Sequence, residues 1–206
     1  MKQLTVTGVG KTSETPDTVE IDFTLSVVNQ DYAACNAQSA VAFESLRQAV
    51  YRAGLQPDTL RTASFRLSAR YDHKGGEKVF VGYECAHRLV LRFTLDIPLL
   101  DAVMAELGDS GAYADFSVRF MLYDDRAVKN NLLQAAVADA AEKAATIAAA
   151  AGKRLGDIVS ITYGSNEPNL YSRTEYARPR LMAASLSVQP EDVENVDTVT
   201  VVYELL

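Results

Sequence analysis

Residues 127–151 read AVKNNLLQAAVADAAEKAATIAAAA, and Gly152 follows directly. Twelve of these residues are alanine. Alanine loses little side-chain entropy in a helix, and its small side chain lets another backbone approach closely. The segment therefore predicts a helix about 40 Å long that packs tightly on another element, with Gly152 as its stop.

This helix also has a predicted beginning and a predicted buried face. Asp124 or Asp125 is placed to cap the first turn. Apolar side chains recur at heptad-like spacing, which predicts the stripe that faces the core. The predicted stripe consists of Leu133, Val137, Ala140, Ala144, Ile147 and Ala151.

The first quarter of the chain alternates between strand and helix patterns. Residues 3–9 and 18–28 are apolar at alternate positions, which is typical of a sheet with one buried and one solvated face. Residues 31–53 change to a helical period, with Asp31 as N-cap and Gly54 as stop. These segments predict two strands followed by a helix.

A long hairpin is predicted next. Residues 59–72 and 78–95 are strand-like and are joined by a Gly-rich loop, which is typical of a hairpin. Eighteen extended residues would reach about 60 Å, well past the usual strand length. A bulge is therefore expected near Gly82.

The remaining elements complete an α+β chain. A short helix is predicted over 96–107, and strands over 115–123, 155–164 and 197–206. Residues 165–184 have no clear period and predict a mobile loop. The order is β-β-α-β-β-α-β-α-β-β, which favours a mainly antiparallel sheet with the long hairpin and with helices packed on one face. We expect one composite domain, 1–206, with 1–95 and 96–206 as its sub-parts.

Charge and composition exclude several partners. The net charge is −7 and the pI is about 4.9, which argues against nucleic acid and against an anionic membrane surface. No apolar run is long enough to span a bilayer. The first residues lack the features of a signal peptide. The chain as given is expected in the cytoplasm, or in the periplasm or outside the cell if a leader has been removed.

Two motifs resemble catalytic sequences without their context. Gly8–Thr12 resembles the end of a phosphate-binding loop, but no helix is predicted after it. Gly108–Gly111 resembles a serine nucleophile loop, but no histidine base stands in a matching context. His87 lies on the apolar face of its strand and is expected to be a core residue. No metal, cofactor or catalytic residue is predicted.

The two cysteines, Cys35 and Cys85, both fall on predicted inward faces. One interpretation is a pair of buried free thiols that act as small hydrophobes. The other is a redox pair that helix-on-sheet packing brings together.

The loop that follows the sixth predicted strand is rich in tyrosine and arginine, residues enriched where proteins contact partners. It is either a crossover or an assembly surface. Its candidate interaction residues are Tyr171, Arg173, Tyr176, Arg178 and Arg180.

Three blocks of sequence stand in one order along the chain: Val6–Gly10 with Pro16-Asp17, Leu67–Asp72 with Gly82–Ala86, and Ala135–Ala144 with Gly152. Together they resemble the SIMPL domain family, also described as YggE-like oxidative-stress-defence or periplasmic immunogenic proteins. The resemblance implies an α+β fold and, for some members, ring-like or channel-like homo-oligomers. It implies no established catalytic residues.

The hypothesis that follows is a non-enzymatic, self-assembling bacterial protein in stress defence or the cell envelope, with no known protein partner besides itself. Two alternatives stay open. One is a thiol-based redox protein that uses Cys35 and Cys85, and the other is a small-ligand binding module with a pocket between the long helix and the sheet.

Overall fold

The structure is a computed structural model of the 206-residue chain, and it describes residues 2–112, 114–164, 167–176 and 188–206. The fold is α+β, as predicted. Its elements are β1 (Lys2–Glu14), β2 (Thr18–Asn29), α1 (Tyr32–Arg52), the 3-10 turn Pro57–Thr59, β3 (Leu60–Lys74), β4 (Glu77–Thr94), α2 (Ile97–Asp109), β5 (Ala114–Met121), α3 (Asp125–Ala150), β6 (Leu155–Tyr163), β7 (Tyr171–Tyr176) and β8 (Val193–Leu205).

The chain divides into two compact units. Unit 1 combines residues 1–16, 122–173 and 191–206, and unit 2 combines residues 17–121 and 174–190. Helix α3 lies in unit 1, and helices α1 and α2 lie in unit 2. The single composite domain predicted for residues 1–206 stays a prediction.

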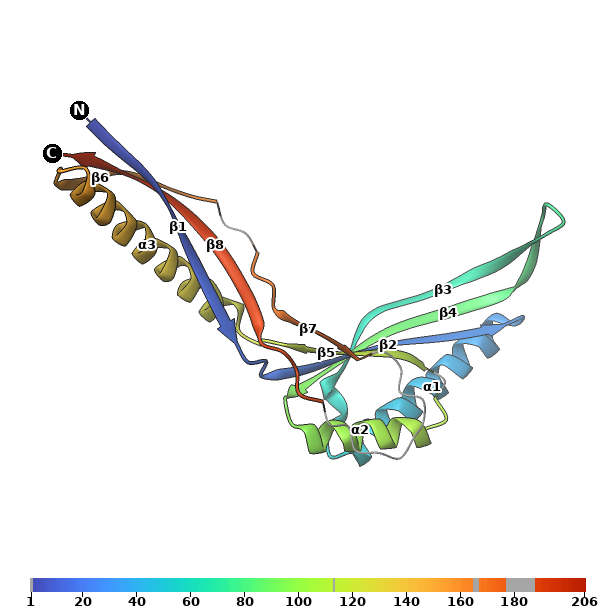
Figure 1. Ribbon diagram of the computed structural model, residues 1–206. Coiled ribbons are helices and arrows are strands. Elements are labelled where there is room, and N and C mark those ends of the chain that lie inside the picture. Colours follow the sequence, from blue (N-terminus) through green and yellow to red (C-terminus); the bar gives the residue numbers. More distant parts are fainter. Residues whose placement is uncertain (1, 113, 165–166, 177–187) are drawn as a thin grey trace. The chain divides into compact units, whose positions relative to one another are not determined.

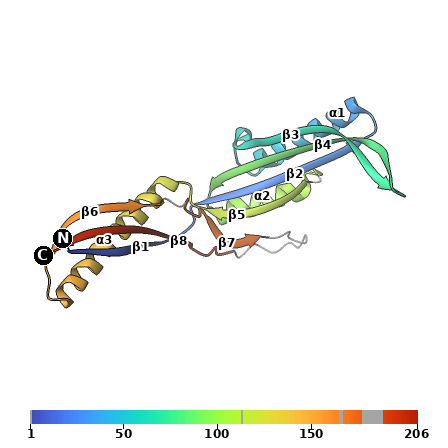
Figure 2. The same cartoon turned by 90° about the horizontal axis from the view of Figure 1, so that it is seen from above.

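Unit 1 is a three-stranded antiparallel sheet with α3 packed along it. The strand order is β1-β8-β6, with β8 in the centre, as Figure 2 shows. Every residue of β1 has a partner in β8, from Lys2 opposite Leu205 to Glu14 opposite Val193. The prediction that the first strand ends at residue 9 is therefore wrong, because β8 offers a partner for five more residues.

The predicted buried face of α3 is partly wrong. Ala140 and Ala144 are fully buried as expected, but Leu133 and Val137 are only partly buried, and Ile147 and Ala151 are exposed. The buried residues follow a four-residue spacing: Val128, Leu132, Ala136, Ala140, Ala144 and Ala148. Over most of its length, α3 therefore turns its smallest side chains to the sheet.

The reason lies in two glycines of β1. A Cβ atom on Gly8 would lie 2.0 Å from the backbone oxygen of Ala136, and one on Gly10 would lie 2.1 Å from that of Leu132. The strand and the helix thus meet backbone to backbone, and no larger side chain fits between them. The pattern of hydrophobic residues predicts the wrong buried face of α3, because the size of the side chains, and not their apolarity, determines which residues fit against β1.

The second sheet has five strands in the order β3-β4-β2-β5-β7, and all of it belongs to unit 2 except residues 171–173 of β7. Helices α1 and α2 lie on one face of this sheet, as Figure 1 shows. The prediction of helices on one face is confirmed here. The core between these layers is made of large side chains, and its fully buried members include Ile21, Phe23, Leu25, Leu46, Val50, Leu89, Leu91, Val103 and Phe120.

The predicted hairpin is confirmed, with Gly75 and Gly76 at its turn, both at positive φ. Its register shifts between Arg70 and Tyr71, opposite Gly82 and Phe80, so the bulge lies where the sequence predicts it. Gly82 has φ +139°, and a Cβ there would lie 2.6 Å from the Asn29 oxygen. Asn29 is the last residue of β2, and the hairpin of β3 and β4 continues beyond it (Figure 1).

One segment differs from its prediction. Residues 165–184 were expected to lack regular structure, yet Tyr171–Tyr176 forms β7 at the sheet edge beside β5. An edge strand needs pairing along one side only, so its sequence does not have to show the alternation of a buried strand. The predicted element order therefore lacks one strand. None of the described helices is long and apolar enough to cross a membrane.

Candidate functional site

The two motifs that resemble catalytic sequences have structural roles. Gly8–Thr12 lies inside β1, and no helix follows it. Gly108–Gly111 forms the end of α2, where Ser110 is the C-cap and its Oγ donates to the Leu107 oxygen at 2.8 Å. Gly111 has φ +66°, the left-handed conformation typical of a helix stop.

His87 is a core residue, as the sequence predicts. Its ring lies between Phe43 and Phe65, with ring centroids 5.1 and 5.2 Å away. Its Nε2 is 3.0 Å from the Thr62 Oγ1. Burial lowers the pKa of His87 below its usual 6.5, because a charged imidazole is disfavoured away from water.

The two thiols lie together between α1 and the sheet of unit 2. Cys35 is in the first turns of α1 and Cys85 is in β4, and both are fully buried. The Cys35 Sγ is 3.3 Å from the Tyr83 oxygen and 3.4 Å from the Val27 oxygen. Burial, and next the charge of a neighbouring Cys85 thiolate, raise the pKa of Cys35.

The other face of this sheet carries a charged cluster that the sequence analysis did not single out. Glu20 is almost fully buried, and its carboxylate accepts from Arg92 at 2.6 Å and from Arg119 at 2.7 Å. Asp22 also pairs with Arg119 and lies 3.4 Å from Arg88. Two carboxylates and three guanidinium groups therefore meet across three adjacent strands.

Pairing of this kind suits a structural role. A buried carboxylate is tolerated when cations and hydrogen bonds compensate its lost hydration. The two arginines directly opposite Glu20, Arg92 on β4 and Arg119 on β5, do so. The alternating acids of β2 and the alternating arginines of β4 were visible in the sequence, but only the register shows which of them pair.

The Tyr/Arg segment is only partly described. Tyr171 begins β7, and Arg173 in the same strand has a side chain that is 78% exposed and lies 3.5 Å from Glu194. Tyr176 is the last residue of β7. Arg178 and Arg180 lie outside the described residues.

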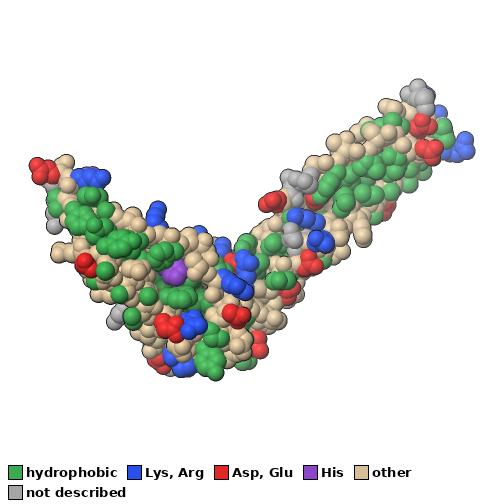
Figure 3. Space-filling model, turned by 180° about the vertical axis from the view of Figure 1, so that it is seen from behind, with side chains coloured by type: hydrophobic (Ala, Val, Ile, Leu, Met, Phe, Trp, Pro, Cys, Tyr) green, Lys and Arg blue, Asp and Glu red, His purple; other side chains and the backbone are tan. Residues whose placement is uncertain are grey.

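β6 is the most unusual surface of unit 1. It is an edge strand whose residues are exposed from Asp157 to Tyr163. Ile158, Val159 and Ile161 are each about half exposed, at 50%, 47% and 51%. In Figure 3, which shows the molecule from behind, hydrophobic side chains form a band over unit 1, on the right of the view.

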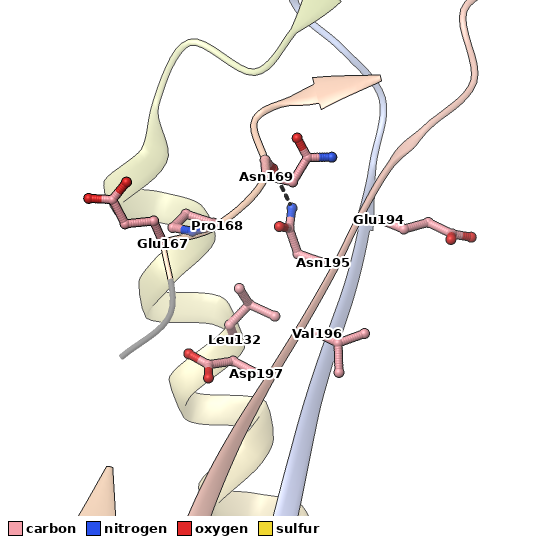
Figure 4. Close-up of a pocket in the computed structure, with 8 residues that line it drawn as sticks. All are labelled: Leu132, Glu167, Pro168, Asn169, Glu194, Asn195, Val196 and Asp197. Carbon is pink, nitrogen blue, oxygen red and sulfur yellow. Dashed lines mark hydrogen bonds between the residues drawn. The ribbon is translucent and has the colours of Figure 1, made fainter. Parts of the chain in front are cut away.

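A small hollow of about 220 Å³ lies beside β8 in unit 1. It is lined by Leu132, Glu167, Pro168, Asn169, Glu194, Asn195, Val196 and Asp197, as Figure 4 shows. The Asn195 Nδ2 donates to the Asn169 oxygen at 2.9 Å, and the Asp197 Oδ2 accepts from the Tyr163 hydroxyl at 2.7 Å. Because the two buried side chains, Asn195 and Asp197, already have hydrogen-bond partners, the hollow gives no specific support to a small-ligand module.

Within the described ranges, no group of three or more His, Cys, Asp or Glu side chains could hold a metal ion. Asp139 of α3 is an example of an acid whose carboxylate is already occupied, by a lysine and by a backbone amide. Asp139 accepts from the Val9 amide at 2.6 Å and lies 2.7 Å from Lys143, and these bonds, that of Lys143 first, lower its pKa.

Comparison with known proteins agrees with the resemblance seen in the sequence. Residues 4–203 match the family described as "SIMPL: Protein of unknown function (DUF541)". The chain is also similar to the 26 kDa periplasmic immunogenic proteins of Brucella melitensis biotype 1 and Brucella abortus strain S19. Each is 28% identical over 173 residues, which cover 81% of this chain and 68% of the relative. This chain therefore belongs to the SIMPL family.

Proposed function

We propose that this SIMPL protein is a non-enzymatic, self-assembling component of the bacterial cell envelope, and that β6 is the strand through which copies pair. The observation that carries the proposal is the exposure of large apolar side chains along β6, whose outer edge pairs with none of the described strands. An exposed apolar edge strand is a template for another strand, and soluble proteins normally protect such edges.

The faces of β6 support the same proposal. Ile161 and Tyr163 stand opposite Val201 and Val199 of β8, both of which are buried under α3. On β8 this face is covered by the helix, whereas on β6 the corresponding side chains stay exposed. Within the described part of the chain, β6 therefore has an outer edge that pairs with no strand and an apolar face that the helix leaves uncovered.

The opposite edge of the same sheet is protected. On β1, the Val9 amide donates to Asp139 of α3, and the Thr7 oxygen accepts from Lys143 Nζ at 3.2 Å. Side chains of α3 thus occupy backbone groups that an incoming strand would need. This contrast favours β6 as the pairing edge of unit 1.

The proposed occupant is a second copy of β6. An antiparallel pairing centred on Ser160 would place Val159 opposite Ile161 and Ile158 opposite Thr162. Asp157, the only charged residue of the strand, would lie opposite Tyr163, so no like charges would meet. Such a twofold contact is self-complementary, as closed symmetric oligomers require, and it would extend the sheet by backbone hydrogen bonds.

The test is light scattering during size exclusion at micromolar concentration. We expect the wild-type chain to elute as a multiple of its 22.4 kDa, and Ile161→Lys to reduce that mass, because a charge in a closed strand pair would be desolvated. Val159→Lys should have the same effect. A wild-type chain that stays strictly monomeric would contradict the proposal.

The matched control is Ile147→Lys. Ile147 lies in the same unit, on the outer face of α3, and is 46% exposed, so this variant makes the same chemical change away from β6. Circular dichroism should show that both lysine variants keep the wild-type fold. If Ile147→Lys lowers the mass as much as Ile161→Lys does, β6 is not the pairing edge.

A periplasmic location and a role in stress defence belong to the same proposal. The support for location is the name of the two Brucella relatives, and the support for stress defence is the family resemblance. Osmotic-shock fractionation of the native host should release the protein with the periplasm. A host that lacks the gene should survive peroxide less well, and wild-type protein should restore survival better than Ile161→Lys.

A further inference from the structure

We propose that Cys35 and Cys85 form an intramolecular disulfide that ties α1 to β4 when the chain folds in an oxidising compartment. This inference concerns the interior of unit 2 and does not depend on self-assembly through β6. It assigns the two buried thiols an oxidative modification, for which their position is suited.

The geometry begins with the sheet. Val27 of β2 and Cys85 of β4 are direct partners in the antiparallel ladder, so their Cα atoms are about 4.5–5.5 Å apart and their side chains share a face. That face is the one covered by α1, since Leu25, Leu89 and Leu91 on it are fully buried with α1 residues.

Cys35 reaches this ladder from the helix. Its Sγ donates to the Val27 oxygen at 3.4 Å and to the Tyr83 oxygen at 3.3 Å. Val27 is the ladder partner of Cys85, and Tyr83 precedes Cys85 by two residues on β4. The charge of a Cys85 thiolate is one of the causes that raise the pKa of Cys35, after burial, and this agrees with the two thiols lying close together. A disulfide requires Cα atoms roughly 4.4–6.8 Å apart with the Cβ atoms facing each other, so the proposal requires this spacing between α1 and β4.

The chemistry needs an oxidant, for which a small-molecule disulfide is sufficient. One cysteine thiolate attacks the oxidant's disulfide, forms a mixed disulfide and releases one thiol. The second cysteine thiolate then attacks the protein sulfur of that mixed disulfide and releases the second thiol. In total, two protein thiols are oxidised to one disulfide and one oxidant disulfide is reduced to two thiols.

Burial determines when this reaction occurs. Both cysteines are fully buried, and burial raises the pKa of Cys35, so the folded reduced protein reacts slowly. Oxidation is expected during folding, before α1 docks, or through local opening of the first turns of α1. Once formed, the bond is shielded from reductants in the same way.

The experiment refolds the denatured, reduced chain in a buffer of oxidised and reduced glutathione. The reaction is stopped with N-ethylmaleimide under denaturing conditions, and intact mass is measured. We expect no maleimide adduct and a mass about 2 Da below the reduced chain, with one peptide pair joined through Cys35 and Cys85. The oxidised chain should melt roughly 10 °C above the reduced one, because the bond closes a loop of about 50 residues.

Two variants make the test specific. Cys35→Ala and Cys85→Ala should each leave one thiol, which becomes alkylated or glutathionylated, and neither should show the rise in melting temperature. The comparison of oxidised and reduced wild-type chain stands even if a variant folds poorly. Two adducts per wild-type chain after refolding, or disulfides found only between chains, would overturn the inference.

Discussion

In unit 1 one helix and in unit 2 two helices pack on one face of an antiparallel sheet, but the side chains at the two contacts differ in size. In unit 1 the contact is made of Gly8, Gly10 and a row of alanines on α3. In unit 2, α1 and α2 meet the sheet through leucine, valine and phenylalanine side chains. The first interface depends on closeness of backbones, and the second depends on the amount of apolar surface removed from water.

This difference determines how each interface fails. A backbone contact cannot accept an added atom, because the neighbours that would have to move are main-chain atoms of a strand and a helix. An interface of large side chains tolerates small shifts but loses energy when a side chain is shortened. The same size of change therefore has opposite consequences in the two units.

The largest effect is expected for Gly8→Ala. The new Cβ would lie 2.0 Å from the Ala136 oxygen and 2.7 Å from the Ala140 Cβ, so α3 must move off β1. We expect a loss of more than about 4 kcal/mol in the free energy of unfolding, which is at the exceptional end for single substitutions. Urea denaturation followed by circular dichroism measures this.

Gly164→Ala is the matched control for that change. Gly164 also lies in unit 1, and apart from its chain neighbours no atom of the described residues lies within 4 Å of the position its Cβ would take. The variant should differ from wild type by less than about 0.5 kcal/mol. Equal stability of Gly8→Ala and Gly164→Ala would show that the contact between β1 and α3 is looser than these distances require.

The next effect is expected for Leu46→Ala, on the face of α1 that packs on the sheet. Leu46 is 1% exposed, and its truncation leaves a cavity among side chains of β2 and β4. We expect a loss of about 3 kcal/mol, measured by the same denaturation. Val41→Ala is the control, because Val41 is 68% exposed on the same helix, and its loss should stay below about 0.5 kcal/mol.

The two units also differ in how well the sequence predicts them. In unit 2 the alternation in β2 and the helical period of α1 select most of the buried residues, because large apolar side chains determine this core. The period of α1 also selects Tyr32, which is 56% exposed, and misses Ala49, which is fully buried. In unit 1 the same reasoning selects Leu133 and Ile147 on α3, although the structure buries Leu132 and Ala148. A period in hydrophobicity cannot show that glycines on a strand far away in the sequence require the smallest side chains.

The candidate sites show the same limit. His87 could be assigned to the core from its strand face alone. The pairing of Glu20 with Arg92 and Arg119 could not be predicted, since it depends on which residues of three strands stand opposite one another. The closeness of Cys35 and Cys85 also depends on where α1 crosses the ladder, which local pattern does not specify.

A smaller effect is expected at Asp139, whose hydrogen bond with the Val9 amide joins α3 to the edge strand β1. Asp139 has its pKa lowered, first by the hydrogen bond from Lys143 and next by that from the Val9 amide. Its stabilising contribution is therefore complete above the ordinary carboxyl pKa of 3.8 and is lost as the pH falls through the lower folded value. Asp139→Asn should lower the melting temperature near neutral pH, and the deficit should shrink as the pH falls below about 4.

Glu142→Gln is the control for Asp139→Asn. Glu142 is an exposed acid three positions further along α3, and the change again replaces a carboxylate by an amide. Its melting temperature should follow that of wild type across the same pH series. A deficit in Asp139→Asn that persists unchanged at low pH would show that the amide itself, and not the lost charge, weakens the contact.

The smallest effect is expected at His87, where the apolar interface of unit 2 contains a titratable ring. Burial lowers the pKa of His87 from its usual 6.5, so the unfolded chain takes up a proton at a higher pH than the folded chain does. The stability of unit 2 should therefore be highest above pH 6.5 and decline as the pH falls below it. His87→Gln, which keeps a polar group within reach of Thr62, should make the melting temperature less dependent on pH in this range.

The control is His73→Gln, which makes the same exchange at an exposed position of the hairpin. If His73→Gln reduces the pH dependence of the melting temperature as much as His87→Gln does, the buried His87 ring is not the cause of that dependence. The interface of unit 2 would then be insensitive to pH, in contrast to the contact between α3 and β1 in unit 1.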